Sequence, residues 1–136
     1  MAAPTPKTQQ RQIGKQGFIM WNAVWANGDN MTDVAVIDLS AASEGHTNNL
    51  AILKVEWLCT AGIEFTLEFD DDGGSDDEFI LTSTLGSVTW GKACFTEYGC
   101  DGAHYLGSGG TGDLVITTTS AASADEVTLM IYYRVD

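Results

Sequence analysis

Alternating apolar and polar residues mark two segments of this chain as strands that each bury one face. In residues 63–69 every second position is a large apolar residue: Ile63, Phe65, Leu67 and Phe69. The same pattern recurs in residues 127–135: Val127, Leu129, Ile131, Tyr133 and Val135. Because successive side chains of a strand point to opposite sides of a sheet, this period of two predicts an inward-facing row on each strand. We expect the core to include Phe65, Leu67, Phe69, Leu129 and Ile131.

Six further apolar segments lie between clusters of Gly, Ser, Asn and Asp. Together they predict about eight short strands: residues 16–25, 32–39, 50–60, 63–69, 78–83, 87–90, 113–119 and 126–135. This rhythm is typical of an all-β sandwich or barrel, and eight strands in two antiparallel sheets are typical of a jelly roll. The fold prediction is therefore an antiparallel, jelly-roll-like β-sandwich. The glycine-rich residues 91–112 are expected to form a long connection. Residues 50–58 also fit a helix, although their β-branched and aromatic residues favour a strand.

The predicted strand at residues 16–25 is apolar on both sides. One side carries three apolar residues and the other side four: Phe18, Met20 and Val24, then Ile19, Trp21, Ala23 and Trp25. Such a strand lies inside a layered core or is covered by another subunit. We therefore identify Phe18, Trp21 and Trp25 as candidate partner-contacting residues. Cover by residues 91–112 of the same chain is the alternative.

Charge is distributed unevenly along the chain. Lys7, Arg11 and Lys15 lie within the first fifteen residues, which contain no acidic residue. All nineteen Asp and Glu residues follow, so the formal charge is +3 for residues 1–15 and −16 for residues 16–136. A short polar segment cannot bury enough apolar surface to fold alone. The sequence therefore predicts an extended cationic N-terminal arm, residues 1–15, whose basic side chains contact another protein, and a single domain, residues 16–136.

The overall charge of −13 argues against nucleic acid or an anionic membrane as a partner, because an acidic protein repels phosphate groups. No apolar run approaches 18 residues, the length at which a segment becomes a candidate membrane span. The N-terminus does not resemble a secretory signal, so we expect synthesis in the cytoplasm. In that compartment Cys59, Cys94 and Cys100 are expected to be free thiols.

The most acidic segment, residues 70–78, offers carboxylates that are close enough in sequence to bind Ca2+. Its candidate ligands are Asp70, Asp72 and Asp76. The spacing differs from that of an EF-hand loop. The competing interpretation is a solvated hairpin turn whose glycines permit tight backbone geometry, and it is the one we prefer.

No catalytic or structural-metal motif is recognised in the chain. The spacing of Cys94, Cys100 and His104 matches no common zinc pattern. His46 and His104 lie in separate polar or glycine-rich segments without a neighbouring nucleophile motif. Nucleotide-binding and G-x-S-x-G motifs are also missing from the sequence. We therefore expect a protein that is not an enzyme and that carries no cofactor.

Five features taken together suggest a family. They are the arm, residues 36–40, a strand pair at 53–69 with an acidic turn, residues 112–118 and the last strand at 127–135. In this combination the chain resembles the small β-sandwich virion proteins of tailed bacteriophages, among them the jelly-roll decoration (cement) proteins of phage heads. The resemblance implies a non-enzymatic structural protein that binds the outer head surface and bridges capsid subunits. Its partner would be the major capsid protein or another virion protein.

Copies that meet around a symmetry axis of a shell favour a cyclic homo-oligomer, such as a trimer.

The alternative function is a carbohydrate- or receptor-binding module of a virion fibre or tail accessory protein. Tryptophan rings stack on sugars or bases, although they more often fill cores and interfaces. The chain has four: Trp21, Trp25, Trp57 and Trp90.

Overall fold

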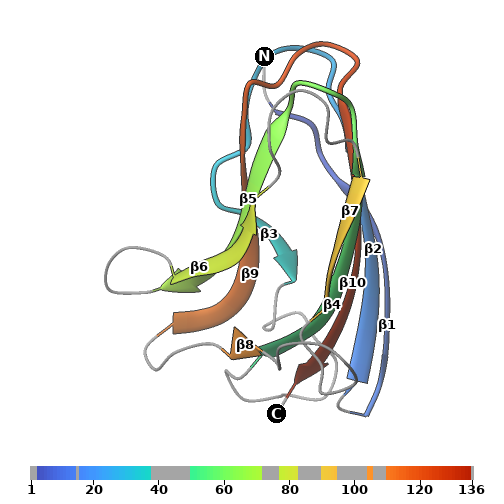
Figure 1. Ribbon diagram of the computed structural model, residues 1–136, viewed down its shortest axis with the longest axis vertical. Coiled ribbons are helices and arrows are strands. Elements are labelled where there is room, and N and C mark those ends of the chain that lie inside the picture. The colour runs from blue at the N-terminus through green and yellow to red at the C-terminus, as the bar shows by residue number, and fades with distance from the viewer. Residues whose placement is uncertain are drawn as a thin grey trace.

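The computed structural model describes residues 3–14, 16–37, 50–71, 77–82, 90–94, 104–105 and 110–135. These residues form ten strands and contain no helix (Figure 1). The strands are β1 (Lys7–Ile13), β2 (Gln16–Val24), β3 (Val34–Ile37), β4 (Leu50–Cys59), β5 (Glu64–Asp71), β6 (Asp77–Thr82), β7 (Trp90–Cys94), β8 (His104–Tyr105), β9 (Gly110–Thr119) and β10 (Glu126–Val135). Residues 50–58, for which the sequence also allowed a helix, lie within strand β4.

Two antiparallel sheets face each other and form a jelly roll. The first sheet has the order β1-β2-β10-β4-β7, with β8 paired to β4, and the second has the order β3-β9-β5-β6. Without β1 and β8, each sheet has four strands, and every connection between consecutive strands leads from one sheet to the other, except that from β5 to β6. This arrangement confirms the predicted jelly-roll-like β-sandwich.

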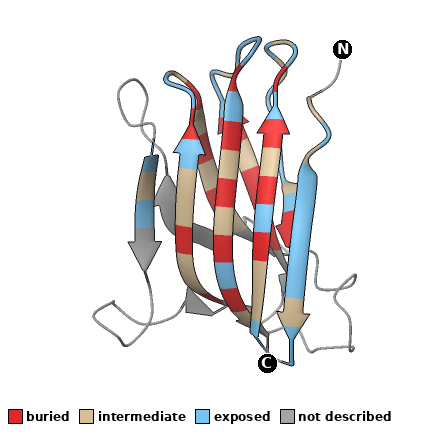
Figure 2. Cartoon of the chain, turned by 90° about the vertical axis from the view of Figure 1, so that its right-hand side faces the viewer, coloured by how far each residue is buried: buried red, intermediate tan, exposed pale blue. Residues whose placement is uncertain are grey.

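The core lies between the two sheets and is built from every second residue of their strands. Figure 2 shows buried bands alternating with intermediate or exposed bands along β2 and β10. Phe65, Leu67, Leu129 and Ile131 are at most 1% exposed, which confirms four of the predicted core residues. The side chain of the fifth, Phe69, lies outside the described part of the structure.

The first strand begins earlier than the sequence analysis expected. Residues 7–13 of the predicted arm form β1, which pairs with β2 over the full register from Lys7↔Asn22 to Ile13↔Gln16. This segment is extended as predicted, but it belongs to the edge of the first sheet. The pairing needs no apolar burial, because hydrogen bonds of the antiparallel ladder satisfy the backbone of a polar strand.

The glycine-rich residues 91–112 are not one long connection. They contain most of β7, all of β8 and the start of β9. The strand expected at residues 87–90 therefore overlaps the observed strand β7 at one residue, Trp90. Residues 83–89 lie outside the described residues. The sequence did not indicate β7, because glycine is usually a sign of a turn and Gly91 lies within this strand.

The β2–β3 and β9–β10 connections are joined at one end of the sandwich. The amide of Trp25 donates a 2.7 Å hydrogen bond to the carbonyl of Asp125, and the amide of Ala124 donates one of 2.8 Å to the carbonyl of Trp25. Deeper in the loop, the amide of Met31 donates to Oγ1 of the buried Thr118 at 2.9 Å. These bonds fix the ends of the two sheets relative to each other.

Among the described residues, no helix is long and apolar enough to cross a bilayer.

Candidate functional site

The structure separates the predicted contact residues into two groups. Lys7 and Arg11 lie on β1 and share the outward side of the first sheet with Phe18, because they pair with Asn22 and Phe18 of β2. Trp21 and Trp25 are at most 1% exposed and point into the core, so the prediction that they contact a partner is wrong. Large aromatic side chains on the inward side of a central strand fill the space between the sheets. Lys15 lies outside the described residues.

The outward side of the first sheet gathers the exposed apolar side chains. We call the outward side of β1, β2, β10, β4 and β7 the docking face. The described residues include six exposed large hydrophobic side chains, and the strand registers place all of them on this face: Ile13, Met20, Val24, Leu58, Trp90 and Tyr132. In Figure 2 this side of the sheet faces the viewer. Because scattered exposed apolar residues are normal, their confinement to one face is the informative observation.

Basic residues gather on the same face. The strands of the first sheet contain five basic and two acidic residues: Lys7, Arg11, Lys54, Lys92 and Arg134 against Glu56 and Glu126. Each of these seven residues lies on the outward side of the sheet, because the residue directly opposite it on the neighbouring strand does. The strands of the second sheet contain seven acidic residues and no basic residue. The sandwich therefore carries positive charge on one sheet and negative charge on the other, which the sequence order conceals.

Aromatic and charged side chains interlock at the centre of the docking face. The rings of Phe18 and Tyr132 lie 4.9 Å apart between centroids, and Nζ of Lys54 lies 5.1 Å above the Tyr132 ring. The same ammonium group is 2.7 Å from Oε1 of Glu56. This hydrogen bond lowers the pKa of Glu56 and raises that of Lys54, so both groups are ionised at neutral pH. Glu56 therefore adds no unpaired negative charge to the face.

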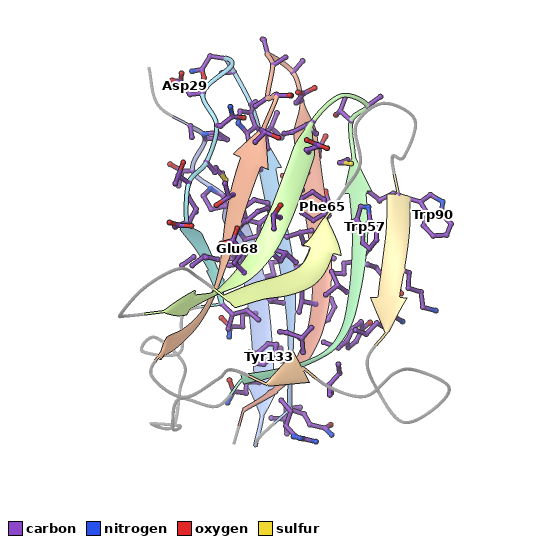
Figure 3. The ribbon with its side chains drawn as sticks, turned by 60° about the vertical axis from the view of Figure 1, so that its left-hand side comes forward. Asp29, Trp57, Phe65, Glu68, Trp90 and Tyr133 are labelled. Carbon is purple, nitrogen blue, oxygen red and sulfur yellow. The ribbon has the colours of Figure 1, made fainter. Side chains whose placement is uncertain are left out.

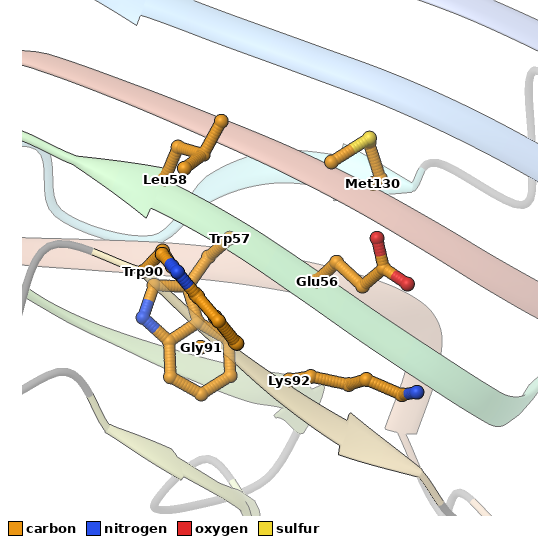
Figure 4. A pocket seen from close by; sticks show the side chains of 7 residues that line it. All are labelled: Glu56, Trp57, Leu58, Trp90, Gly91, Lys92 and Met130. Carbon is orange, nitrogen blue, oxygen red and sulfur yellow. The ribbon is translucent and has the colours of Figure 1, made fainter.

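A groove of about 330 Å³ lies at the β4–β7 edge of the docking face (Figure 4). Seven residues line it: Glu56, Trp57, Leu58, Trp90, Gly91, Lys92 and Met130. The indole of Trp90 is 67% exposed, and Leu58, directly opposite it on β4, is 51% exposed. Glu56 and Lys92 form the next cross-strand pair and place opposite charges at one rim. The groove is thus an apolar trough with one charged border.

The floor of this groove depends on a close approach between β4 and β7. Gly91 lies opposite Trp57, and a Cβ atom at position 91 would overlap the indole ring. The ring of Trp57 continues inward and meets Phe65 of β5 edge to face, with 6.2 Å between centroids and 82° between planes. Figure 3 shows Trp57 and Phe65 pointing toward each other, whereas Trp90 points away from the sandwich. The two tryptophans therefore have different roles: Trp57 supports the groove and Trp90 forms its exposed wall.

Two further hollows lie on the first sheet. One, of about 390 Å³, is lined by Arg11, Ile13, Gln16, Gly17 and Phe18 at the β1–β2 hairpin. Another, of about 310 Å³, lies where β4 ends and β10 begins, next to Thr60 and Glu126. The hairpin hollow repeats the chemistry of the Trp90 groove, since an exposed apolar side chain, Ile13, lies beside a cation, Arg11. Both edges of the docking face therefore offer an apolar hollow with a basic neighbour.

The described residues contain no group of three or more His, Cys, Asp or Glu side chains that could hold a metal ion. Asp70 lies at the end of β5, and Asp72 and Asp76 lie outside the described residues, so the candidate Ca2+ site remains a prediction. Cys59 is buried, and it is a thiol rather than half of a disulfide. Its pKa is raised by burial and by the negative charge of Asp125, which makes it a poor nucleophile.

Sequence reasoning missed the residues that complete the face, above all Lys54, Lys92 and Trp90. A signal was present in β4, where Lys54, Glu56 and Leu58 alternate with Val55, Trp57 and Cys59. The side chains on one side of the strand are all apolar and face the core, whereas those on the other side include both charged and apolar residues. What the sequence did not supply was the neighbouring strand β7, which brings Trp90 opposite Leu58 and Lys92 opposite Glu56.

The chain matches no protein-family model. It also matches no curated protein. A solved structure with some likeness is the CBM22-1 xylan-binding domain of Xyn10C from Paenibacillus barcinonensis. The two chains share 14% sequence identity over 99% of this chain and 84% of that one, with a TM-score of 0.42. A likeness at this level does not bear on function, which has to be argued from the docking face.

Proposed function

We propose that this protein is a non-catalytic attachment protein that binds an acidic protein surface through the docking face. The observation that supports this is the joint placement of exposed apolar and basic side chains on one side of one sheet. Interfaces combine apolar and aromatic side chains with arginine at the centre, and complementary charges select the partner and its orientation. The rest of the molecule is strongly acidic, so an acidic partner meets attraction on this side only.

The size of the face suits a protein partner. Five strands at about 4.8 Å spacing, with a rise of about 3.3 Å per residue, cover roughly 650 Å². A standard interface buries about 800 Å² on each partner. The docking face alone therefore comes close to this area, and loops at its border add to it. A flat surface of this extent is larger than a small ligand needs, whereas it is of the order that a folded partner covers.

The sequence resemblance extends this proposal to a partner in a virion. A phage shell presents many identical sites, so a modest contact energy per copy is multiplied when several linked copies bind. Under this proposal the partner is the major capsid protein or another virion protein, and the protein is a decoration protein on the outer head surface. A homo-oligomer, such as a trimer, would supply the linked copies.

Occupancy on particles tests the proposal. Particles lacking the protein are incubated with the wild type, with Lys92→Glu, or with a control, Thr32→Glu/Ser123→Glu. All three stay acidic, and both variants lower the net charge by two, but Thr32 and Ser123 are exposed loop residues away from the docking face. We expect about tenfold weaker binding for Lys92→Glu, near-wild-type binding for the control, and weaker wild-type binding at high salt. Equal binding of all three proteins, or no binding to particles, would contradict the proposal.

A photo-crosslinking residue gives a second, positional readout. We would place it at Gln9, which points outward from β1, or at Thr66, which lies on the second sheet opposite Thr117 of β9. Adducts with a shell protein are expected from position 9 and not from position 66. Adducts from position 66 alone would place the interface on the second sheet.

A further inference from the structure

We infer that the Trp90 groove is the anchor site of the docking face and takes one apolar side chain, flanked by carboxylates, from an acidic protein segment. This inference rests on the proposed function and names the chemistry of its partner. Of the three hollows on the first sheet, the groove is the one lined by two exposed large apolar side chains, Trp90 and Leu58. Its volume of about 330 Å³ is at the small end of ligand pockets, which fits one large side chain better than an extended ligand.

The lining of the groove favours an apolar anchor. Its floor and walls are carbon surfaces from Trp57, Leu58, Trp90 and Met130, and charged groups occur only at the rim formed by Glu56 and Lys92. Trp90 and Leu58 expose 67% and 51% of their surface, so a side chain between them would remove apolar area from water on both of its sides. Tryptophan in such a pocket is the residue type that most often dominates an interface.

The charge at the rim selects acidic neighbours for that anchor. The carboxylate of Glu56 is already paired with Lys54 at 2.7 Å. Among the described residues Lys92 has no ion pair, and its side chain is exposed. A carboxylate next to the anchor in the partner's sequence would therefore meet an available ammonium group. Lys7, Arg11 and Arg134 extend the same preference across the face.

A sugar ring is less well served by this groove. Its hydroxyl groups need several hydrogen-bond partners, because a desolvated hydroxyl without one is costly. The rim supplies one ammonium group and a carboxylate of which one oxygen is already engaged. The second hollow, beside Ile13 and Arg11, repeats the pattern of apolar surface and cation at the other edge. Ile13 there is displaced from Trp90 by four strand spacings across the sheet, or about 19 Å, and by six residues along the strands, or about 20 Å. A partner protein can span this distance while holding both sites.

Binding of a defined acidic peptide to the whole protein tests the anchor site. The probe is the blocked pentapeptide Glu-Asp-Phe-Asp-Glu, and the readout is the backbone amide and indole N–H signals of the isotope-labelled protein. We expect shifts in the Trp90 indole and in the amides of Leu58, Gly91 and Lys92. The affinity should fall at least fivefold when the peptide's Phe is replaced by Ala, and again when its acids are replaced by Asn and Gln.

Matched protein variants locate the effect. Trp90→Ala should abolish the shifts, whereas Thr32→Ala, at an exposed loop residue away from the docking face, should leave the affinity unchanged. The inference is wrong if no signal around the groove moves, or if the amide-only peptide binds as well as the acidic one. It is also wrong if xylotriose or a trigalacturonate shifts these signals at lower concentrations than the peptide, because the groove is then a saccharide site.

Particle occupancy separates this inference from the proposed function. If the docking face binds the shell but the groove is not its anchor, Lys92→Glu lowers occupancy and Trp90→Ala does not. If both variants lower it while the control pair does not, the groove and the face act together. If neither lowers it, the proposed function fails regardless of the peptide result.

Discussion

Oη of Tyr133 accepts a 2.6 Å hydrogen bond from Nε2 of Gln10, which lies 123 positions earlier in the chain. Tyr133 belongs to β10, the third strand from the edge, and Gln10 to the edge strand β1. The phenol reaches across β2 over Gly17, where a Cβ atom would overlap the ring. It also donates to Oε1 of Gln12 at 3.3 Å. A fully buried core residue therefore holds the cationic edge strand of the docking face in place.

Replacing Tyr133 with Phe should loosen β1. The change removes both hydrogen bonds to the strand but keeps the ring in the core, so we expect a loss of about 1 kcal/mol in the free energy of unfolding. Amide hydrogen exchange should speed up in β1 more than in β10. Tyr132→Phe is the control, because this neighbouring phenol is 42% exposed and its loss should change stability by less than about 0.5 kcal/mol. Equal exchange in β1 of both variants would show that Tyr133 does not hold the strand.

Gly17→Ala should destabilise the fold by about 1–3 kcal/mol, because the added methyl group meets the ring of Tyr133 in a packed core. In a Tyr133→Leu background the same substitution should cost clearly less, since the overlapping ring is gone. Urea denaturation of the four proteins gives this coupling as a double-mutant cycle. Additive effects would mean that Gly17 is needed for a reason other than the ring.

Phe65→Ala and Trp90→Ala should differ sharply although both delete a large aromatic side chain. Phe65 is 1% exposed and packs against Trp57, so its loss should cost about 3–5 kcal/mol. Trp90 is 67% exposed on an edge strand, so its loss should stay within about 0.5 kcal/mol. Thermal or urea unfolding measures both. A large loss at Trp90 would indicate that it supports the fold, which weakens its assignment to binding.

Asp125 should matter for the connection between β9 and β10. It is 6% exposed, and its Oδ2 accepts a 2.8 Å hydrogen bond from the amide of Ala122. Asp125→Ala leaves that amide without its partner, and we expect a loss of about 1–3 kcal/mol. Asp125→Asn retains an acceptor oxygen and should lose less. Equal losses in the two variants would show that the charge, and not the hydrogen bond, is what the loop requires.

Alkaline pH should destabilise the protein through Cys59. Burial, and then the charge of Asp125, raise the pKa of its thiol, so the folded state favours the protonated form. The contribution of the Cys59 thiol to the free energy of unfolding is complete below the unfolded-state pKa of about 8.5. It is lost as the pH rises through the folded-state pKa. Urea unfolding at pH 7 and pH 9.5 should show a larger decrease for the wild type than for Cys59→Ala. Identical decreases would mean that the thiol titrates alike in both states.

The strand content and the inward rows of the sandwich could be predicted from the sequence because they depend on neighbours along the chain. The alternation at Phe65 and Leu67, and at Leu129 and Ile131, is a local consequence of the pleat. The phase of a strand then decides which residues enter the core. In β2 the residues on both sides are apolar, so this local rule does not show which side is buried. Only the packed sandwich shows that Trp21 of β2 and Trp25 just after it fill the core.

The docking face could not be predicted in this way, because it depends on which strands become neighbours. Lys7, Lys54 and Lys92 are far apart in the chain and meet on one surface through the order β1-β2-β10-β4-β7. The Trp90 groove likewise requires a glycine-containing strand to pair with β4, so that Gly91 can cover the ring of Trp57. Strand order follows from the lowest free energy of the whole packed sandwich, which sums contacts between distant residues. Periodicity along the sequence reports only which side of a strand is buried, and the tertiary structure alone determines which surfaces the outward sides form.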